Sequence, residues 1–291
     1  MTEPGTSQTT GRGKPVLITG CSSGIGRCVA LGLEARGYRV FATARKHRDV
    51  SELQSLGLEA LMLDLADTNS VRDALETVLS RTGGTLYALF NNGAYGQPGA
   101  LEDLSREVLR AQFETNLFGW HELTRAVLPV MRRQGHGRII HNSSVLGLVS
   151  LPYRGAYNAS KYALEGLADT LRLELRNTDI HVSLIEPGPI TSRFRANAHQ
   201  AFRDHIDAQN SVHREIYQRM EKRLVSEGPV APFTLPPEAV LEKVVHALES
   251  RRPHIRYYVP CPTWLFATLK RLRPGRVLDK VLMRVGSREN R

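Results

Sequence analysis

The feature that most constrains the fold is a regular alternation of short apolar runs with longer segments of helical periodicity. The apolar runs cover residues 16–19, 40–44, 60–63, 86–90, 138–142, 181–185 and 255–259. They are almost continuously apolar, which is typical of strands buried on both faces of a parallel sheet. The helical segments between them cover residues 26–36, 70–81, 106–133, 156–176 and 237–250. This order predicts an α/β fold with a single Rossmann-like, doubly wound parallel sheet of about seven strands and helices on both faces.

The length of 291 residues suits one large α/β domain, and both ends of the chain differ from it in composition. Residues 1–13 form a polar leader without the apolar core of a signal peptide. Three cysteines without paired close spacing argue against a disulfide framework and against a zinc site. These features predict a cytoplasmic protein with no metal.

The net charge of +10 is concentrated at the end of the chain. Residues 251–291 carry eleven Lys and Arg against Asp279 and Glu289, so the rest of the chain is nearly neutral and nucleic-acid binding is not expected. The tail, residues 261–291, alternates apolar and basic groups along two segments around Trp264–Leu272 and Val277–Val285. Such basic amphipathic helices either pack on the domain or a second subunit, or make peripheral contact with a membrane surface.

A glycine-rich loop follows the first strand and leads directly into a helix. It reads Thr19-Gly20-Cys21-Ser22-Ser23-Gly24-Ile25-Gly26. Glycines permit a tight turn and a close approach of backbone N–H groups to a pyrophosphate, which the positive end of the helix also attracts. We therefore expect this loop, including Ser22, Ser23 and Ile25, to bind a dinucleotide.

The end of the second strand indicates which dinucleotide is preferred. An NAD site usually places an acid there, whereas this chain has Arg45 and Lys46 and no carboxylate before Asp49. Guanidinium and ammonium groups suit a 2′-phosphate. The alternative is a solvated basic turn, since Arg48 continues the run. We expect NADP in preference to NAD.

Polar and small residues close the next two strands. Asp64, followed by Leu65, is placed either to accept from the adenine amino group or to cap the next helix. The segment Asn91-Asn92-Gly93-Ala94 has small residues that would allow the backbone to pass under a cofactor.

The strongest chemical pattern is Tyr157 and Lys161, which an i, i+4 spacing places on one face of a helix. A neighbouring ammonium favours the phenolate and brings a tyrosine toward general acid–base use. Ser144 follows the fifth strand, where its hydroxyl can bond a substrate oxygen whose charge grows during reaction, with Ser143 as the competing candidate. Asn116, inside a long apolar helix, either bonds a neighbouring carbonyl or also holds a water between Lys161 and solvent.

A rigid turn, Pro187-Gly188-Pro189-Ile190-Thr191, follows the sixth strand. It is suited to hold the carboxamide of a nicotinamide, with Thr191 within reach of the diphosphate.

Together these motifs, in this order, resemble the signature of the short-chain dehydrogenases/reductases over roughly residues 14–260. The resemblance implies Tyr157 as acid/base, Lys161 lowering the pKa of Tyr157 and bonding the nicotinamide ribose, Ser144 orienting a carbonyl and Asn116 supporting a proton relay. One departure is Gly93-Ala94, where the family commonly has Ala-Gly. Cofactor binding should survive, provided that Ala94 adopts a φ that a Cβ tolerates.

More narrowly, the loop, the Ala44-Arg45-Lys46 turn and Glu186-Pro187-Gly188-Pro189-Ile190 resemble bacterial NADP-dependent aldehyde reductases. That subgroup is similar to 17β-hydroxysteroid and retinol dehydrogenases, which implies a hydrophobic aldehyde, ketone or alcohol as substrate. The family resemblance also implies a homodimer or homotetramer formed through the helices at 106–133 and 156–176.

Residues 193–235 contain no strand pattern and one predicted helix, around 213–225. We expect this segment to be a substrate lid over the cofactor, the alternative being a loosely packed surface excursion. Tyr95, Leu151 and Phe194 are predicted as apolar walls of the substrate pocket. Two rival functions remain, a non-catalytic NADP-binding sensor or scaffold and a membrane-surface steroid or retinoid dehydrogenase.

Overall fold

The computed structural model describes residues 11–226, 228, 233–259 and 275–289. Its centre is a seven-stranded sheet in the order β3-β2-β1-β4-β5-β6-β7, with every neighbouring pair parallel. The strands are β1 Pro15–Ile18, β2 Arg39–Ala44, β3 Glu59–Met62, β4 Ala88–Asn91, β5 His136–Asn142, β6 Asp179–Pro187 and β7 Arg256–Val259. The predicted fold class and all seven predicted strands are therefore confirmed, with small shifts at their ends.

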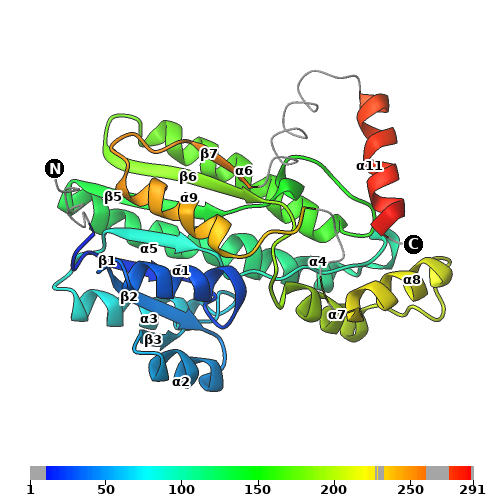
Figure 1. Cartoon of the computed structure of the whole chain (residues 1–291), viewed down its shortest axis with the longest axis horizontal. Helices are drawn as coiled ribbons and strands as arrows, with labels where there is room; N and C mark the ends of the chain where they lie inside the picture. The colour runs from blue at the N-terminus through cyan, green and yellow to red at the C-terminus, as the bar shows by residue number, and fades with distance from the viewer. Residues whose placement is uncertain (1–10, 227, 229–232, 260–274, 290–291) are drawn as a thin grey trace, which may run out of the picture.

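Two apolar cores lie on the two faces of the sheet. One face is covered by α1 Gly24–Glu34, α2 His47–Ser55 and α9 Glu238–Glu249. The other is covered by α3 Thr68–Arg81, α5 Gly119–Gln134 and α6 Gly155–Glu174. Figure 1 shows these two layers around the sheet. The sequence pattern predicted each of these helices except α2, whose nine residues bury only Asp49, Val50 and Leu53.

The segment predicted as one helix, residues 106–133, is divided into three parts. The helix α4, Arg106–Phe113, is followed by a π-helical turn, Glu114–Phe118, before α5 begins. Such single π-turns recur at functional sites because they displace a side chain from the regular helical register. This turn carries the buried Asn116.

Two helices form the segment predicted as a lid. The helix α8, Arg214–Val225, matches the predicted one, whereas α7, Phe194–His205, was not predicted. Phe202 of α7 and Tyr217 and Met220 of α8 form a third apolar cluster with Ala100. The Tyr217 hydroxyl accepts from the Ala100 backbone N–H (2.9 Å) and donates to the carboxylate of Asp103. The segment is thus tied to the chain after β4, and a loosely packed excursion does not describe it.

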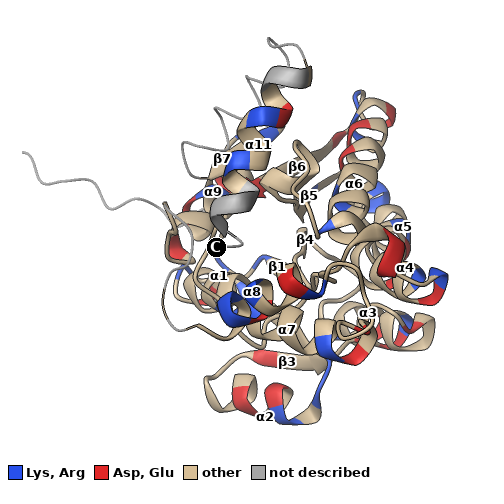
Figure 2. Ribbon diagram, turned by 90° about the vertical axis from the view of Figure 1, so that its right-hand side faces the viewer, with Lys and Arg blue, Asp and Glu red and all other residues tan. Residues whose placement is uncertain are grey.

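The last described element is α11, Gly275–Glu289, within the predicted tail. Leu282 is buried and Leu278, Val281 and Val285 are half-buried, whereas Lys280 and Arg284 are exposed. The apolar stripe predicted for this part of the tail therefore faces inward. The other predicted stripe, around Trp264–Leu272, lies outside the described residues. Figure 2 shows α11 and α8 at the end of the molecule where the strands finish, both carrying Lys and Arg.

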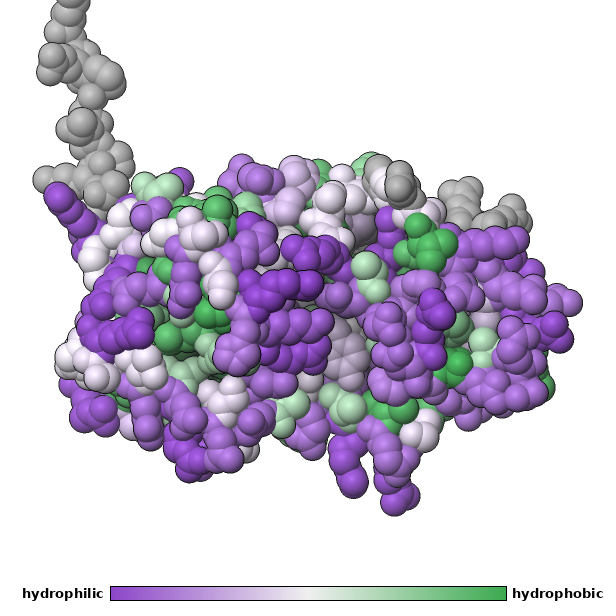
Figure 3. Space-filling model, turned by 90° about the horizontal axis from the view of Figure 1, so that it is seen from below, coloured by the Kyte–Doolittle hydropathy of each residue, from purple (hydrophilic) through white to green (hydrophobic). Residues whose placement is uncertain are grey.

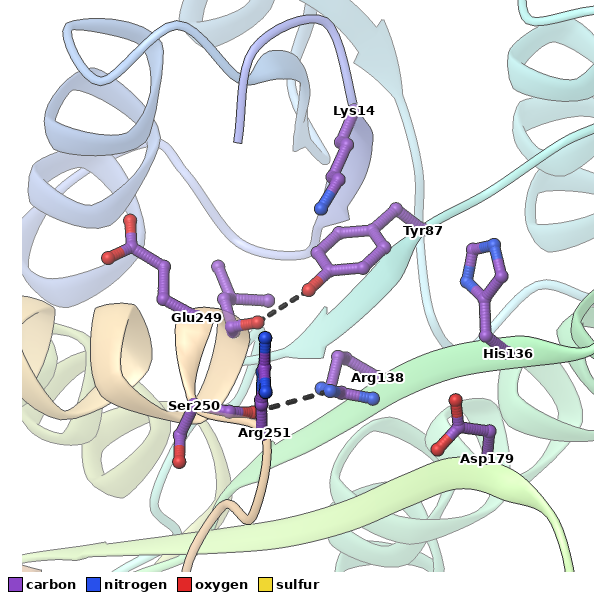
Figure 4. Close-up of a pocket in the computed structure, with 9 residues that line it drawn as sticks. Lys14, Tyr87, His136, Arg138, Asp179, Glu249, Ser250 and Arg251 are labelled. Atoms are coloured by element: carbon purple, nitrogen blue, oxygen red, sulfur yellow. Dashed lines mark hydrogen bonds between the residues drawn. The ribbon is translucent and has the colours of Figure 1, made fainter. Parts of the chain in front are cut away.

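The opposite end of the sheet holds a polar cleft of about 330 Å³, lined by Lys14, Tyr87, His136, Arg138, Asp179, Leu248, Glu249, Ser250 and Arg251. Figure 4 shows how the side chains in this cleft hold the end of α9. The Tyr87 hydroxyl donates to the Leu248 carbonyl, and Arg138 donates to the Ser250 carbonyl (3.3 Å). Carbonyls at a helix C-terminus have no partner within the helix, and basic side chains commonly satisfy them. We therefore assign this cleft a structural role.

Candidate active site

The carboxyl ends of β1 and β4 are joined by one buried threonine. The Thr19 hydroxyl oxygen accepts from the backbone N–H groups of Asn92 (2.8 Å) and Gly93 (2.9 Å). The Asn92 side chain donates to the Thr19 and Gly20 carbonyls in return. These bonds bring the glycine-rich loop and the Asn91–Ala94 segment side by side, at the edge where a doubly wound sheet binds its ligands.

The glycines of the loop are required by close backbone contacts. Gly20 has φ +72°, and a Cβ there would lie 2.4 Å from the Gly93 Cα. A Cβ at Gly26 would lie 2.2 Å from the Gly20 carbonyl oxygen. The swapped pair Gly93-Ala94 fits this packing, because it places the glycine where the backbone meets Gly20. Ala94 does not have a positive φ, a conformation that among the described non-glycine residues only Tyr153 and Phe233 adopt, so its Cβ is tolerated.

The start of α1 fits an anionic group. Its N-cap residue, Ser23, makes no side-chain capping hydrogen bond, and its first turn has no acidic residue. Uncapped N–H groups and the positive end of an eleven-residue helix attract a phosphate. The loop at Ser22, Ser23, Gly24 and Ile25 therefore has the donors that a dinucleotide diphosphate needs.

Arg45 and Lys46 lie exposed just after β2. Burial raises the pKa of Tyr95, and the positive charge of Arg45 partly opposes that rise. Arg45 is therefore close enough to the loop that follows β4 for its charge to act on Tyr95. At the end of β3, the Asp64 carboxylate accepts from the Ala66 N–H (3.0 Å), and it is Asp67 that caps α3. The alternative that Asp64 caps the next helix is therefore wrong, because Asp67 holds the N-cap position. Leu65, which follows Asp64, is buried against Gly93 and Gly119.

Tyr157 and Ser144 lie together at the carboxyl end of β5. Burial raises the pKa of Tyr157 to about 12, and a hydrogen bond with Ser144 and the charge of Arg154 oppose that rise. The sequence suggested a lowered pKa, but in the chain by itself burial is the larger effect. Ser144 also begins the 3-10 turn Val145–Gly147, where its hydroxyl accepts from the Leu146 N–H (3.1 Å).

Lys161 lies one turn along α6 and is 1% exposed. Its ammonium donates to the Asn142 carbonyl (2.8 Å) and lies 5.7 Å from the centre of the Tyr157 ring. Burial lowers its pKa to about 7. The Asn142 side chain donates to Asn92 (2.9 Å), so Lys161 is linked through Asn142 to the glycine-rich loop.

Two further asparagines fix the backbone around this cluster. The Asn116 amide donates to the Tyr95 carbonyl (2.9 Å) and its oxygen accepts from the Tyr95 N–H (3.1 Å). Asn116 therefore bonds a neighbouring carbonyl, as the simpler of its two interpretations expected. Asn91 donates to Thr124 (3.0 Å) and is fully buried below the site.

Ser143 points away from Ser144 into the protein. Its hydroxyl donates to Glu165, whose other oxygen pairs with Arg256 (3.0 Å). Arg256 also contacts Asp169 and the fully buried Glu186, which directly precedes the Pro187–Thr191 turn. Two backbone hydrogen bonds hold that turn, from the Gly188 N–H to the Val259 carbonyl and from the Thr191 N–H to the Leu235 carbonyl (3.0 Å). Ile190 and Leu235 also form an isolated parallel β-bridge.

The three residues predicted as walls of the substrate pocket differ in how they lie relative to Tyr157. Phe194 lies against Tyr157, with ring centres 5.4 Å apart, and against Gly96, where a Cβ would lie 2.9 Å from the phenyl ring. Tyr95 is half-buried on the loop after β4, and Leu151 is half-buried ahead of α6, where its carbonyl accepts from Asn158. Phe194 is therefore the one that contacts the predicted acid/base.

Sequence reasoning missed three residues around the site. Arg193 begins the lid, and its guanidinium donates to the Ser22 carbonyl (3.3 Å) in the glycine-rich loop. Trp120 lies under Lys161, with the ammonium 4.2 Å from the ring centre. Glu165 lies one turn beyond Lys161 on α6. Its i, i+4 spacing from Lys161 was the only available signal, and nothing in the sequence links Arg193 or Trp120 to the site.

Within the described residues, no group of three or more His, Cys, Asp and Glu is placed to hold a metal ion. The two described cysteines are free, with Cys21 buried and Cys28 half-buried. The groups that the described residues bring together at this site are hydroxyl, phenol, ammonium and amide groups, beside a loop suited to a dinucleotide.

Comparison with known proteins identifies this arrangement. The family model described as short chain dehydrogenase matches residues 14–202, and the chain belongs to the short-chain dehydrogenase/reductase family. It is thus an oxidoreductase of a family that binds nicotinamide cofactors.

Its relatives cover nearly the whole chain. It is 46% identical to the uncharacterized oxidoreductase YbbO of Escherichia coli over 97% of this chain and 99% of that one. It is 34% identical to human 17-beta-hydroxysteroid dehydrogenase type 1, over 89% of this chain and 80% of that protein. The NADPH-dependent 3-dehydrocapnine reductase of Ornithobacterium rhinotracheale is 31% identical, over 91% and 94% of the two chains. The expected similarity to hydroxysteroid dehydrogenases is confirmed.

A solved structure has the same fold. A short chain dehydrogenase/reductase from Burkholderia phymatum, determined in complex with NAD, superposes with a TM-score of 0.74 at 26% identity. The match covers 92% of this chain and 95% of that chain.

Proposed function

We propose that this chain interconverts hydrophobic aldehydes or ketones and alcohols, using NADP and with Tyr157 as the acid/base. The observation that carries the proposal is the cluster of Ser144, Tyr157 and Lys161, in which Ser144 and Lys161 are buried, beside the glycine-rich loop. Family membership supports an oxidoreductase that uses a nicotinamide cofactor. A bound reduced nicotinamide would supply the hydride.

The protonation of Tyr157 favours carbonyl reduction. With a pKa raised to about 12, its hydroxyl is protonated near neutral pH and has a proton to give to a substrate carbonyl oxygen. The Ser144 hydroxyl, bonded to Tyr157, orients that oxygen and stabilises the negative charge that develops on it. Lys161 would bond the ribose, and Asn116 remains a predicted support for a proton relay between Lys161 and solvent.

The preference for NADP rests on two exposed cations after β2. Arg45 and Lys46 are available to a 2′-phosphate, and no carboxylate precedes Asp49. One relative is named for its dependence on NADPH, whereas one solved neighbour was determined with NAD. We give NADP priority because the charges in this chain favour the doubly charged phosphate.

The hydrophobic class of substrate is supported by the apolar surroundings of Tyr157. Phe194 contacts its ring, and the two other predicted walls, Tyr95 and Leu151, are half-buried. A relative that acts on a hydroxysteroid has a hydrophobic substrate. We therefore propose a substrate with an apolar body and a single reacting carbonyl.

A substrate screen tests the proposal. Purified protein is mixed with NADPH and a panel of aldehydes and ketones that vary in chain length and ring system, and NADPH absorbance is followed. We expect oxidation of NADPH by hydrophobic members of the panel. If the chain binds NADPH tightly but oxidises it with none of them, the rival function of a sensor or scaffold is supported instead.

We also propose that the chain forms a homodimer or homotetramer through α5 and α6. Large apolar side chains are exposed there, including Phe118 and Leu167, and they border a shallow apolar groove with Leu117 and Ala163. Light scattering would give the mass in solution. Phe118→Glu with Leu167→Glu should yield the monomer mass if two copies meet on this face, and an unchanged mass would place the contact elsewhere.

Peripheral membrane contact through the tail is the weaker alternative. Leu282 of α11 is buried and Leu278, Val281 and Val285 are half-buried, which favours packing of the tail on the protein, although Met283 is exposed. Figure 3 shows the face on the side of α2 and α7, away from α11, and hydrophilic side chains dominate that face. Among the described residues, no helix is long and apolar enough to cross a bilayer. Co-sedimentation with anionic liposomes in rising salt tests the alternative, which is excluded if binding is absent or unaffected by deletion of residues 263–291.

A further inference from the structure

Lys161 is a cation with almost no access to water. It is 1% exposed, and burial opposes its charge. An unpaired buried ammonium tends to lose its proton, so a lysine that must stay charged needs compensating groups close by. The Asn142 carbonyl, 2.8 Å away, is one such group. Two others come from residues outside the catalytic set, Trp120 and Glu165.

Trp120 presents the face of its indole ring to the ammonium, 4.2 Å from the ring centre. Its orientation is fixed from two sides. The indole N–H donates to the Gly93 carbonyl (2.7 Å), and the ring stacks on His141 with an interplanar angle of 10°. The face of a tryptophan ring attracts a cation, and the attraction is stronger when the cation is removed from water.

Glu165 supplies a negative charge on the same helix face, one turn beyond Lys161. It is 7% exposed and raises the pKa of Lys161 against the effect of burial. Its carboxylate is held by the Ser143 hydroxyl and by Arg256.

Arg256 does not neutralise Glu165, because it is shared by three acids. It also contacts Asp169 (2.8 Å) and Glu186 (3.0 Å). Glu186 is completely buried, and burial together with repulsion from Glu165 raises its pKa to about 9, so Glu186 is protonated near neutral pH. Glu165 and Asp169 then share Arg256, and Asp169 also pairs with Arg172 (3.4 Å), so Glu165 is the acid of this group that also acts on Lys161.

Two other titratable groups beside Lys161, His141 and Tyr157, are neutral near pH 7. His141, from β5, has a pKa lowered to about 3 by burial and by the charge of Lys161. Tyr157, on the same helix, has its pKa raised to about 12. Among the described elements around Lys161, α5 contributes the uncharged Trp120, and β6 and β7 contribute Glu186 and Arg256. Glu165 is therefore the carboxylate that acts on Lys161.

We infer that Trp120 and Glu165 are positioning residues that hold Lys161 in its charged form beside Tyr157. This inference rests on the proposed function for its consequence, namely that Lys161 must be charged during turnover. It concerns the free chain, however, and can be tested without activity.

The test is an NMR titration of lysine side chains in the purified full-length protein without cofactor, with the Lys161 signal assigned by its loss in Lys161→Met. Glu165→Gln keeps the size and hydrogen bonding of the side chain but removes its charge. We expect the Lys161 midpoint to move to lower pH by about one pH unit or more. Trp120→Leu should also lower the midpoint, and Trp120→Phe, which retains an aromatic face, should lower it less.

Asp169→Asn is the matched control, because Asp169 shares Arg256 with Glu165 but is farther along α6 from Lys161. Its Lys161 midpoint should stay close to that of the unsubstituted chain. Glu165→Asp keeps the charge and should therefore have a midpoint closer to that of the unsubstituted chain, whereas Glu165→Ala, which also removes the charge, serves if Glu165→Gln fails to fold. An unchanged Lys161 midpoint in folded Glu165→Gln or Glu165→Ala and in a folded Trp120 variant would overturn the inference.

The pH profile of NADPH-dependent turnover separates this inference from the proposed function. In Glu165→Gln, we expect the loss of kcat at alkaline pH to begin at lower pH, in parallel with the Lys161 midpoint. If the unsubstituted chain shows no turnover while the midpoints shift as expected, the proposed function fails and the role of Glu165 stands. If turnover is present and neither profile nor midpoint moves, the role of Glu165 and Trp120 fails alone.

Discussion

Phe194 and Tyr157 meet edge to face, with ring centres 5.4 Å apart and an interplanar angle of 67°. Phe194 is the first residue of α7, so the segment predicted as a lid contacts the predicted acid/base at the first turn of that helix. The ring of Phe194 is 38% exposed and lies over Gly96, where no side chain fits. An apolar group placed here forms one wall of the space above the Tyr157 ring.

We expect Phe194→Ala to weaken the use of large hydrophobic carbonyls. Removal of an apolar wall of this size costs about 1.5–3 kcal/mol of substrate binding, which corresponds to roughly tenfold to hundredfold in kcat/KM. The loss should arise mainly from KM, and small aldehydes should be affected less. Steady-state kinetics on a series of increasing chain length would measure it. Val212→Ala, an exposed change on the same lid, is the control, and an equal loss in both variants would contradict the role of Phe194.

Tyr157→Phe should abolish turnover and leave cofactor binding nearly unchanged. The substitution keeps the ring that packs on Phe194 but removes the hydroxyl that bonds Ser144. Loss of a general acid typically costs about 10²–10⁴-fold in rate. NADPH oxidation gives the rate, and fluorescence titration gives the cofactor Kd.

Tyr162→Phe is a matched control for that variant, since Tyr162 lies on the same helix and its hydroxyl donates to the Leu148 carbonyl (2.7 Å). It should retain turnover. Activity in Tyr157→Phe comparable with that of Tyr162→Phe would remove Tyr157 from the mechanism.

Most of the fold was predictable, because a parallel sheet buried on both faces imposes continuous apolar runs. All seven strands and the main covering helices carry that pattern. The helices that were missed, α2 and α7, are short and polar, with only three buried residues each, so periodicity gave little indication of them. The π-turn at Glu114–Phe118 was also missed, because it depends on the bonds of Asn116 to Tyr95, which is distant along the chain.

The site was predictable where its residues follow strands or share a helix face. Ser144, Tyr157 and Lys161 meet these conditions, and the structure brings them together. The pKa of Tyr157 was not predictable from spacing, since its burial is decided by distant segments such as the start of the lid. Arg193 and Trp120 reach the site only through tertiary packing.

Arg45→Asp should shift the cofactor preference toward NAD. The substitution removes a charge-assisted contact with the 2′-phosphate and places a carboxylate near the ribose hydroxyls. We expect roughly a tenfold to hundredfold decrease in the ratio of NADPH to NADH affinity. Kd values for both cofactors check this directly. Arg48→Asp makes the same change in charge at an exposed position of α2 and should have a smaller effect; unchanged selectivity in Arg45→Asp would show that the 2′-phosphate is held elsewhere.

Glu186→Gln should make the stability of the protein less dependent on pH. The pKa of Glu186 is raised from its usual value to about 9 in the folded chain by burial and by Glu165. In the unfolded chain this acid ionises near pH 4.5, so between about pH 4.5 and 9 the unfolded state loses a proton that the folded state keeps. The contribution of this group to stability is therefore fully present below pH 4.5 and is lost as the pH rises toward 9.

Glutamine has the shape of the protonated acid but does not ionise, so the Tm of Glu186→Gln relative to the unsubstituted protein should rise steadily across that interval. Thermal unfolding at a series of pH values would measure the difference. Asp169→Asn, which removes an acid from the same arginine, should show no such trend in that interval, because Arg256 and Arg172 outweigh burial and lower the pKa of Asp169 from 3.8, so its titration affects stability only at more acidic pH. A Tm difference for Glu186→Gln that is constant with pH would mean that Glu186 is ionised in the folded protein, and that Arg256 alone is enough to hold its charge.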